Sequence, residues 1–303
     1  MASGKAIRKN SLFEQGCQNW SNISGIREYC CPICGEVKKL AELTLEHAPP
    51  SSMGGKEIIL TCYKCNNTAG SQIDAQVANQ QNQLRLIKGF AERSFAQNER
   101  LRLQVNDVKL NVELSKSDDN SGNINFKILG NTNNPEHIKQ MREHAREAAN
   151  SGKEYKFNIQ TVGRYNFHKR LADIGHLKTA FLICTAALGY AFAASANYSE
   201  IRQQIQSPNQ QIAKFYVEVN PKESASNCII ESEEKGIIVV SFSGVIVVLP
   251  HPIQKISVFE ASLEEISAGK IKSTTGKVIP WPENFRADYD NNPDFSFQII
   301  TTS

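Results

Sequence analysis

Alternating hydrophobic and polar positions predict strands in the middle and in the last third of the chain. Between residues 99 and 129, RLRLQV, VKLNVEL and INFKILG alternate, and SKSDDNSGN reads as the turn between the last two. YKFNIQ at 155–160 is a shorter candidate. Near the end, the same pattern predicts strands at KFYVEV, GIIVVSFSGVIVVLP and FSFQII.

Helices are predicted at 71–95, at 133–149 and over most of 166–206. Asn134 as the N-cap, Pro135 at the first helical position and Glu136 next to it mark the start of the second helix. The apolar run Ala180–Ala196 is short for a membrane span of ~20 residues and is diluted by small and polar residues, so a buried core helix is expected. Helices and strands in separate blocks favour an α+β fold.

Length and charge add two expectations. A chain of 303 residues suggests about two domains, and a composition with 40% hydrophobic and 21% charged residues is typical of globular proteins. Residues 76–180 carry 17 Lys and Arg against 11 Asp and Glu, whereas residues 181–303 carry 9 against 13. A partner with phosphates would explain this asymmetry, and so would an unevenly charged solvated surface.

The cysteines indicate a metal site and not a disulfide framework. Five of the 8 fall within a short stretch, at Cys30, Cys31, Cys34, Cys62 and Cys65. The N-terminal segment is basic and has no apolar stretch typical of a signal peptide, so a cytoplasmic protein with no membrane contact is expected. Paired Cys-x-x-Cys spacing in such a protein is typical of metal binding.

Two knuckles of this spacing predict one structural zinc ion, Zn²⁺. Cys31, Cys34, Cys62 and Cys65 would supply four thiolates, which close a tetrahedral site and leave no position for a reactive water. Pro32 assigns Cys31 to the knuckle, and Cys30 is therefore expected to be a bystander. The knuckles are separated by more than the ~15–20 residues of a simple four-cysteine site, so the gap must house something else.

The gap contains a strand, a loop, a second strand and the start of a helix. LTLEH ends in Glu46 and His47, PPSSMGG forms the loop, EIILTC is the second strand, and a helix follows Cys65. Because the knuckles tie the ends of this unit together, Asn66 is expected to return beside Glu46 and His47.

This arrangement resembles the HNH nucleases, the ββα-metal fingers, and among them the zinc-stabilised branch that includes phage recombination endonuclease VII and bacterial HNH proteins. The likeness covers residues 29–75 and is carried by Cys31, Cys34, Glu46, His47, Cys62, Cys65 and Asn66. The resemblance implies that His47 is the general base and that Glu46 and Asn66 hold a catalytic Mg²⁺ or Mn²⁺. Two residues depart from the family pattern, since Glu46 stands where Asp is commoner and Glu57 falls near the place of the middle Asn.

The resulting prediction is an α+β protein in which an N-terminal zinc-stabilised HNH finger precedes a larger mixed α+β domain. Its segments are a loose extension at 1–28 anchored by Trp20, the nuclease module at 29–75 and a domain at 76–303. The last domain is expected to provide specificity, regulation or dimerisation, and the protein could form a homodimer. The expected function is metal-dependent hydrolysis of DNA, and the resemblance suggests restriction or phage defence. The alternative is a non-catalytic zinc-finger protein that binds nucleic acid or another partner.

Several basic residues are candidate nucleic-acid contacts, with plain surface positions as the alternative. RYNFHKR at 164–170 interleaves aromatic and basic residues, as nucleic-acid surfaces do. The candidates are Lys56, Lys64, Arg164, Lys169 and Arg170. The remaining histidines, His137, His144, His168, His176 and His251, lack such a context and are expected to be structural or exposed.

Overall fold

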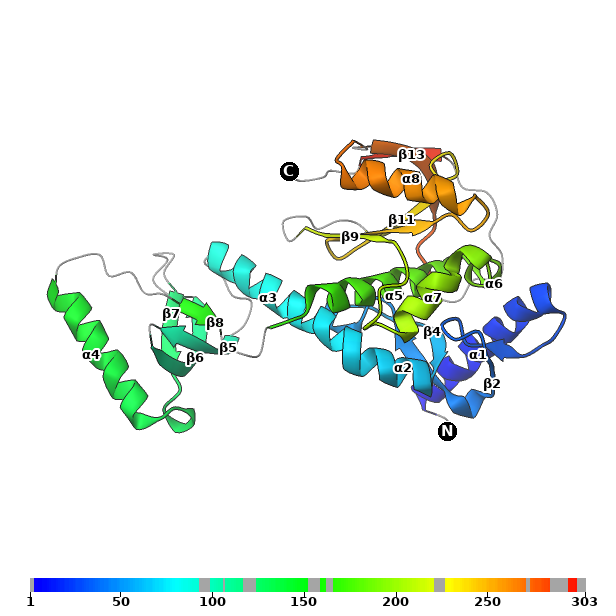
Figure 1. The fold of residues 1–303 in the computed structure, drawn as a ribbon. Coiled ribbons are helices and arrows are strands. Elements are labelled where there is room, and N and C mark those ends of the chain that lie inside the picture. Colours follow the sequence, from blue (N-terminus) through cyan, green and yellow to red (C-terminus); the bar gives the residue numbers. More distant parts are fainter. Residues whose placement is uncertain are drawn as a thin grey trace. The chain divides into compact units, whose positions relative to one another are not determined.

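The structure is a computed structural model of the chain, and it divides into two compact units. It describes residues 3–92, 99–105, 107–116, 124–151, 159–161, 166–220, 227–270, 273–283 and 294–298. The first unit joins Met1–Ala78 to His168–Ser303, and the second is Asn79–Phe167. Figure 1 shows the elements of both units. The functional segments predicted from the sequence, with boundaries at 28 and 75, stay a prediction.

The first unit begins with a helix, so the expectation of a loose extension is wrong over this segment. Helix α1 spans Gly4–Ser24; Ser3 caps its start and Gly25, at φ 73°, ends it. Leu12 and Cys17 are buried on one face and belong to the main core of the unit. This helix has too few apolar residues to give a periodic hydrophobic pattern, so the sequence did not predict it.

The cysteine-rich region follows as two small hairpins and a helix. Strands β1 (Tyr29–Cys30) and β2 (Val37–Lys38) pair around the first knuckle, and β3 (Leu43–His47) pairs with β4 (Glu57–Cys62). Helix α2 (Tyr63–Ala69) comes next, then a π-helical segment (Gly70–Asp74) and α3 (Ala75–Ala91). The helix predicted to start at Asn66, after Cys65, therefore starts three residues earlier, at Tyr63, and Cys65 lies on it.

The rest of the first unit is a six-stranded antiparallel sheet between helices. The strand order is β14-β13-β10-β11-β12-β9. The strands are β9 (Tyr216–Val219), β10 (Cys228–Ser232), β11 (Ile237–Phe242), β12 (Val245–Pro250), β13 (Ser273–Ile279) and β14 (Asp294–Gln298). The predicted strands near the C-terminus are confirmed, and β10 and β13 are additions to them.

Helices cover both faces of this sheet (Figure 1). Helix α8 (Ile256–Ser267) packs on one face through Phe259, Leu263 and Ile266. Helix α5 (Lys169–Leu188) packs against the opposite face, and the short α6 (Tyr190–Ala193) and α7 (Ser199–Gln206) follow it. Strands β11 and β12 are buried along their whole length because both faces are covered.

Helix α5 is the expected core helix, with different bounds. The predicted run to Ala196 is broken at Gly189, where φ is 78°, so α5 ends at Leu188. By length and composition α5 could cross a membrane, and 83% of its apolar window is buried within the protein. This burial is what the core of a globular unit requires of a helix that is apolar on all sides.

The second unit is a four-stranded antiparallel sheet with helices. Its order is β7-β6-β5-β8, with β5 at Glu99–Val105, β6 at Val108–Lys116, β7 at Ile124–Ile128 and β8 at Ile159–Thr161. Helix α4 (Pro135–Ser151) packs through Ile138 and Met141, and Asn134 caps it by accepting from the Glu136 N–H at 3.0 Å. The three strands predicted between residues 99 and 129 and the cap are confirmed. Residues 155–158 of the strand predicted at 155–160 lie outside the described residues, and residues 159–160 belong to β8. Most of the predicted turn at 115–123 also lies outside the described residues.

Candidate active site and zinc centre

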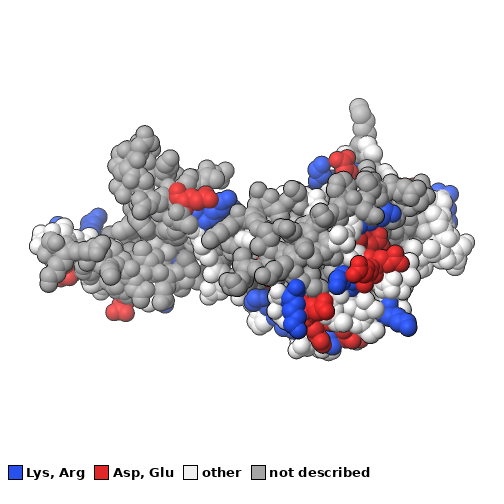
Figure 2. Space-filling view, turned by 90° about the horizontal axis from the view of Figure 1, so that it is seen from above, with Lys and Arg blue, Asp and Glu red and all other residues white. Residues whose placement is uncertain are grey.

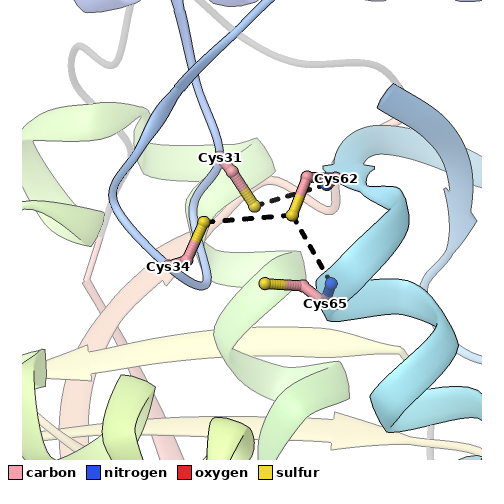
Figure 3. Close-up of side chains that lie close together, drawn as sticks. All are labelled: Cys31, Cys34, Cys62 and Cys65. Atoms are coloured by element: carbon pink, nitrogen blue, oxygen red, sulfur yellow. Dashed lines mark hydrogen bonds between the residues drawn. The ribbon is translucent and has the colours of Figure 1, made fainter. Parts of the chain in front are cut away.

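The first knuckle is held by its own backbone. The Gly35 N–H donates to the Cys31 carbonyl at 2.8 Å, and the Cys31 N–H donates to the Glu36 carbonyl at 2.9 Å. Gly35 has φ 73°, which a residue with a side chain rarely adopts. This tight turn places the sulfurs of Cys31 and Cys34 on the same side of the loop (Figure 3).

The four cysteines predicted to bind zinc come together in the structure. The Sγ atoms of Cys31, Cys34, Cys62 and Cys65 all lie within 4.8 Å of one another. The Cys34 and Cys62 sulfurs are 3.9 Å apart, close to the ~3.8 Å expected between thiolates of a tetrahedral zinc site with Zn–S bonds of ~2.3 Å. The donor set fits structural Zn²⁺, and Cys30 is outside the cluster, as predicted.

Backbone amides and neighbouring thiols favour the thiolate form at two of the four cysteines of this cluster. The Cys62 N–H points at the Cys31 sulfur and the Cys65 N–H at the Cys62 sulfur, each at 3.4 Å. Hydrogen bonds from the Cys31 thiol lower the pKa of Cys34 to about 2 and that of Cys62 to about 6. Hydrogen bonds to neighbouring cysteines and burial raise the pKa of Cys31 and of Cys65 instead. Since zinc binds the thiolate form, Cys34 and Cys62 are poised for the metal, and binding of the ion would release the protons of Cys31 and Cys65.

The hairpin of β3 and β4 lies between the two knuckles and carries the predicted catalytic pair. Its loop closes because Gly55 has no side chain, since a Cβ there would lie 1.6 Å from the Pro49 carbonyl oxygen. The Tyr29 hydroxyl donates to the Leu60 carbonyl at 2.7 Å and accepts from the Leu60 N–H at 3.1 Å. Arg8 of α1 donates to the Glu57 carbonyl through two nitrogens, at 3.1 and 2.8 Å. Neighbouring elements thus hold the start and the middle of β4.

His47 lies at the end of β3 and remains accessible. Its side chain is 39% exposed, and its Nε2 is 3.8 Å from Oε1 of Glu57 on the neighbouring strand. The register shifts between Glu46 and His47, and this shift brings His47 opposite Glu57. Glu57, which stands near the family's middle Asn in the sequence, therefore faces the predicted base.

Glu46, in contrast, is buried and ion-paired. Its Oε1 lies 2.7 Å from the Nζ atom of Lys178, and its Oε2 accepts from the Thr61 hydroxyl at 3.3 Å. Lys178 also lies 2.7 Å from Oδ2 of Asp74, and the Lys178 side chain is only 3% exposed. Burial raises the pKa of Glu46 against the opposing effect of Lys178. Burial alone would lower the pKa of Lys178, but Glu46 and Asp74 together raise it.

Asn66 lies on α2, which packs against both β3 and β4. Its side chain is half-buried. Over the described residues, no hydrogen bond joins Asn66 to Glu46 or His47. The structure therefore brings the helix back to the hairpin, as expected, and the role of Asn66 as a metal ligand stays a prediction.

Residues 31–82 match the model of the HNH endonuclease family. No curated protein and no solved structure matches the chain. The HNH region spans both knuckles, the hairpin and the start of α3, and it implies a nuclease with a nucleic-acid substrate. The predicted resemblance to the HNH family is confirmed, and the narrower likeness to endonuclease VII stays a prediction.

The predicted nucleic-acid contacts lie in different environments. Lys56 and Lys64 are exposed within the HNH region. Lys169 pairs with Asp173 at 2.7 Å, and Arg170 donates to the carbonyls of Pro208 and Gln210, so both side chains already have partners. Arg164 lies outside the described residues. Where the surface in Figure 2 is described, basic and acidic side chains are interspersed.

Two residues at the HNH region were missed from the sequence, Asp74 and Lys178. A signal for Lys178 existed, because a lone lysine in the apolar segment LKTAFLIC must find a carboxylate when the helix is buried. The sequence did not reveal which carboxylate, since Lys178 meets residues more than 100 positions away in the chain.

Proposed function

We propose that the chain is a metal-dependent endonuclease that hydrolyses phosphodiester bonds of DNA, with His47 as the general base. The observation that carries the proposal is an accessible imidazole at the end of β3, inside the matched HNH region. Zinc is proposed to hold the surrounding module together through its four cysteines and to take no part in the reaction.

The residues of the chain supply base and scaffold. His47 takes a proton from a water molecule, whose oxygen attacks the phosphorus and forms the new P–O bond. The bond to the 3′ oxygen breaks, and that oxygen is protonated to a hydroxyl, which leaves a 5′ phosphate on the other product. Glu57, 3.8 Å from Nε2 of His47, is proposed to orient the imidazole in place of the family's middle Asn.

A catalytic divalent ion is part of the proposal, and Glu46 and Asn66 are the residues that would hold it. When bound, Mg²⁺ or Mn²⁺ stabilises negative charge on the phosphate and on the leaving oxygen. Glu46 fits this role through one oxygen only. Its Oε1 is engaged by Lys178, whereas Oε2 accepts a single 3.3 Å hydrogen bond and has lone pairs to spare.

Contacts to DNA are assigned by charge and exposure. Lys56 and Lys64 are proposed to contact phosphates near the scissile bond because both are exposed within the HNH region. Sites in the second unit are proposed to add sequence-independent affinity. The cytoplasmic location, the role in restriction or phage defence and the homodimer are proposals that rest on the sequence alone.

The direct experiment is cleavage of supercoiled plasmid by zinc-loaded full-length protein with Mg²⁺ or Mn²⁺. We expect nicked or linear product, and we expect EDTA to abolish it. Cutting that survives EDTA would contradict the metal-dependent mechanism.

One observation favours the alternative, a zinc module that only binds nucleic acid. Glu46 is buried and ion-paired, as a structural carboxylate would be. Protein that folds, contains zinc and binds DNA but cuts no substrate with either metal would support this alternative.

A further inference from the structure

We propose that Lys178 is a positioning residue of the candidate active site that restricts how Glu46 engages a divalent ion. This inference rests on the proposed function and deepens it. Lys178 lies outside the matched range of residues 31–82, so the site is completed by a helix that the family model does not cover.

Lys178 makes direct contact with Glu46 and Asp74. The ammonium lies 2.7 Å from Oε1 of Glu46 and 2.7 Å from Oδ2 of Asp74, which are charge-assisted distances. The contact joins β3, which carries His47, to the π-helical segment before α3 and to the middle of α5. Glu46 is therefore held in one orientation by an element of the sheet-packing core.

Helix α5 also packs closely against the segment that carries Asp74. A Cβ on Gly175 would lie 2.4 Å from Cγ2 of Val77 and 3.2 Å from the Ile73 carbonyl oxygen. Gly175 is one helical turn before Lys178, so this close approach fixes the height of the ammonium above the carboxylates. The placement of Lys178 is thus built into the helix packing.

The positive charge of Lys178 acts on any divalent ion that Glu46 binds. A cation bound to Oε2 of Glu46 would lie a few ångströms from the ammonium, in a region from which water is largely excluded. Two positive charges at that distance repel, so Lys178 must weaken the binding of the divalent ion and confine it to the Oε2 side. Removing the ammonium leaves two carboxylates without their cation, which favours the ion.

The test is Mn²⁺ binding to the zinc-loaded full chain without DNA, measured by electron paramagnetic resonance. We expect Lys178→Met to bind Mn²⁺ at least about ten-fold more tightly than wild type, and Lys178→Arg, which keeps the charge, to stay within about two-fold. The matched control is Lys169→Met, at the exposed start of the same helix, which should leave the affinity unchanged. Adding Glu46→Gln to Lys178→Met should remove the gain.

If Lys178→Met does not fold, Lys178→Gln removes the same charge and its amide still donates to a carboxylate. Unchanged or weaker Mn²⁺ binding in the neutral variants would overturn the inference, and so would a gain that persists with Glu46→Gln. Because Mn²⁺ affinity is measured without cleavage, failure of this inference can be distinguished from failure of the proposed nuclease function. Wild-type protein that binds Mn²⁺ but never cuts would contradict the nuclease assignment and leave the role of Lys178 in ion binding in place.

Discussion

Replacing Lys178 by Met tests the buried ion pair as a structural element. The change removes the cation from Glu46, whose side chain is only 7% exposed, and keeps most of the volume. Breaking a buried pair by removing one partner leaves an uncompensated charge and costs about 3–5 kcal/mol of the free energy of unfolding. The same substitution at Lys169, whose side chain is 76% exposed, should cost at most about 1 kcal/mol.

Urea unfolding followed by tryptophan fluorescence suits this comparison. The chain has two tryptophans, Trp20 and Trp281, and both belong to the first unit, so the signal reports the unit that contains Lys178. In a double-mutant cycle, Lys178→Met with Glu46→Gln should cost less than the sum of the single changes, with a coupling of about 1–3 kcal/mol. A Lys178→Met protein that loses no more stability than Lys169→Met would refute the reasoning.

Three further predictions concern zinc, pH and salt. Cys62→Ser should lose the zinc ion, and the HNH region should unfold first, because such modules fold with their metal. Metal analysis measures the zinc content, and hydrogen exchange measures the local unfolding. A Cys62→Ser protein with a full zinc content would contradict the assignment. Burial lowers the pKa of His176 to about 4. As the pH falls below about 6.5, His176 is therefore protonated in the unfolded chain but stays neutral in the folded chain. Stability should therefore fall by about 3 kcal/mol as pH drops from 6.5 to 4, and His176→Phe should flatten this dependence in urea titrations at several pH values. Arg102 and Lys109 are exposed on the second unit. Replacing both by Gln should weaken DNA binding and reduce the steepness of log affinity against log salt by up to about 2. An unchanged slope would exclude these two residues as phosphate contacts.

The zinc centre and the hairpin were predictable because their signals are local. Cys-x-x-Cys spacing fixes the direction of two sulfurs within one tight turn, and the two pairs could then share one ion. LTLEH and EIILTC each carry a strand pattern, and Pro and Gly between them mark the loop. The structure places all these residues as the pattern predicts.

The environment of the site was not predictable, because it depends on contacts between distant parts of the chain. Glu46 was predicted as a ligand of a divalent ion, and the structure buries it in an ion pair with Lys178 of α5, which the local pattern does not show. Helix α1 was missed since only a few of its residues are buried. Arg170 was expected at a nucleic-acid surface, and its guanidinium instead holds the backbone after α7. In each case a tertiary partner, invisible in the local pattern, decides the role of the side chain.

The most direct test of the account is strand cleavage by His47→Ala, compared with His144→Ala as a matched control of similar exposure in the second unit. We expect His47→Ala to keep its zinc, its unfolding midpoint and its DNA affinity. We expect its cleavage rate to fall roughly 100- to 10,000-fold, as for the loss of a general base. His144→Ala should cut at the wild-type rate. A His47→Ala protein that cuts as fast as wild type would contradict the central claim.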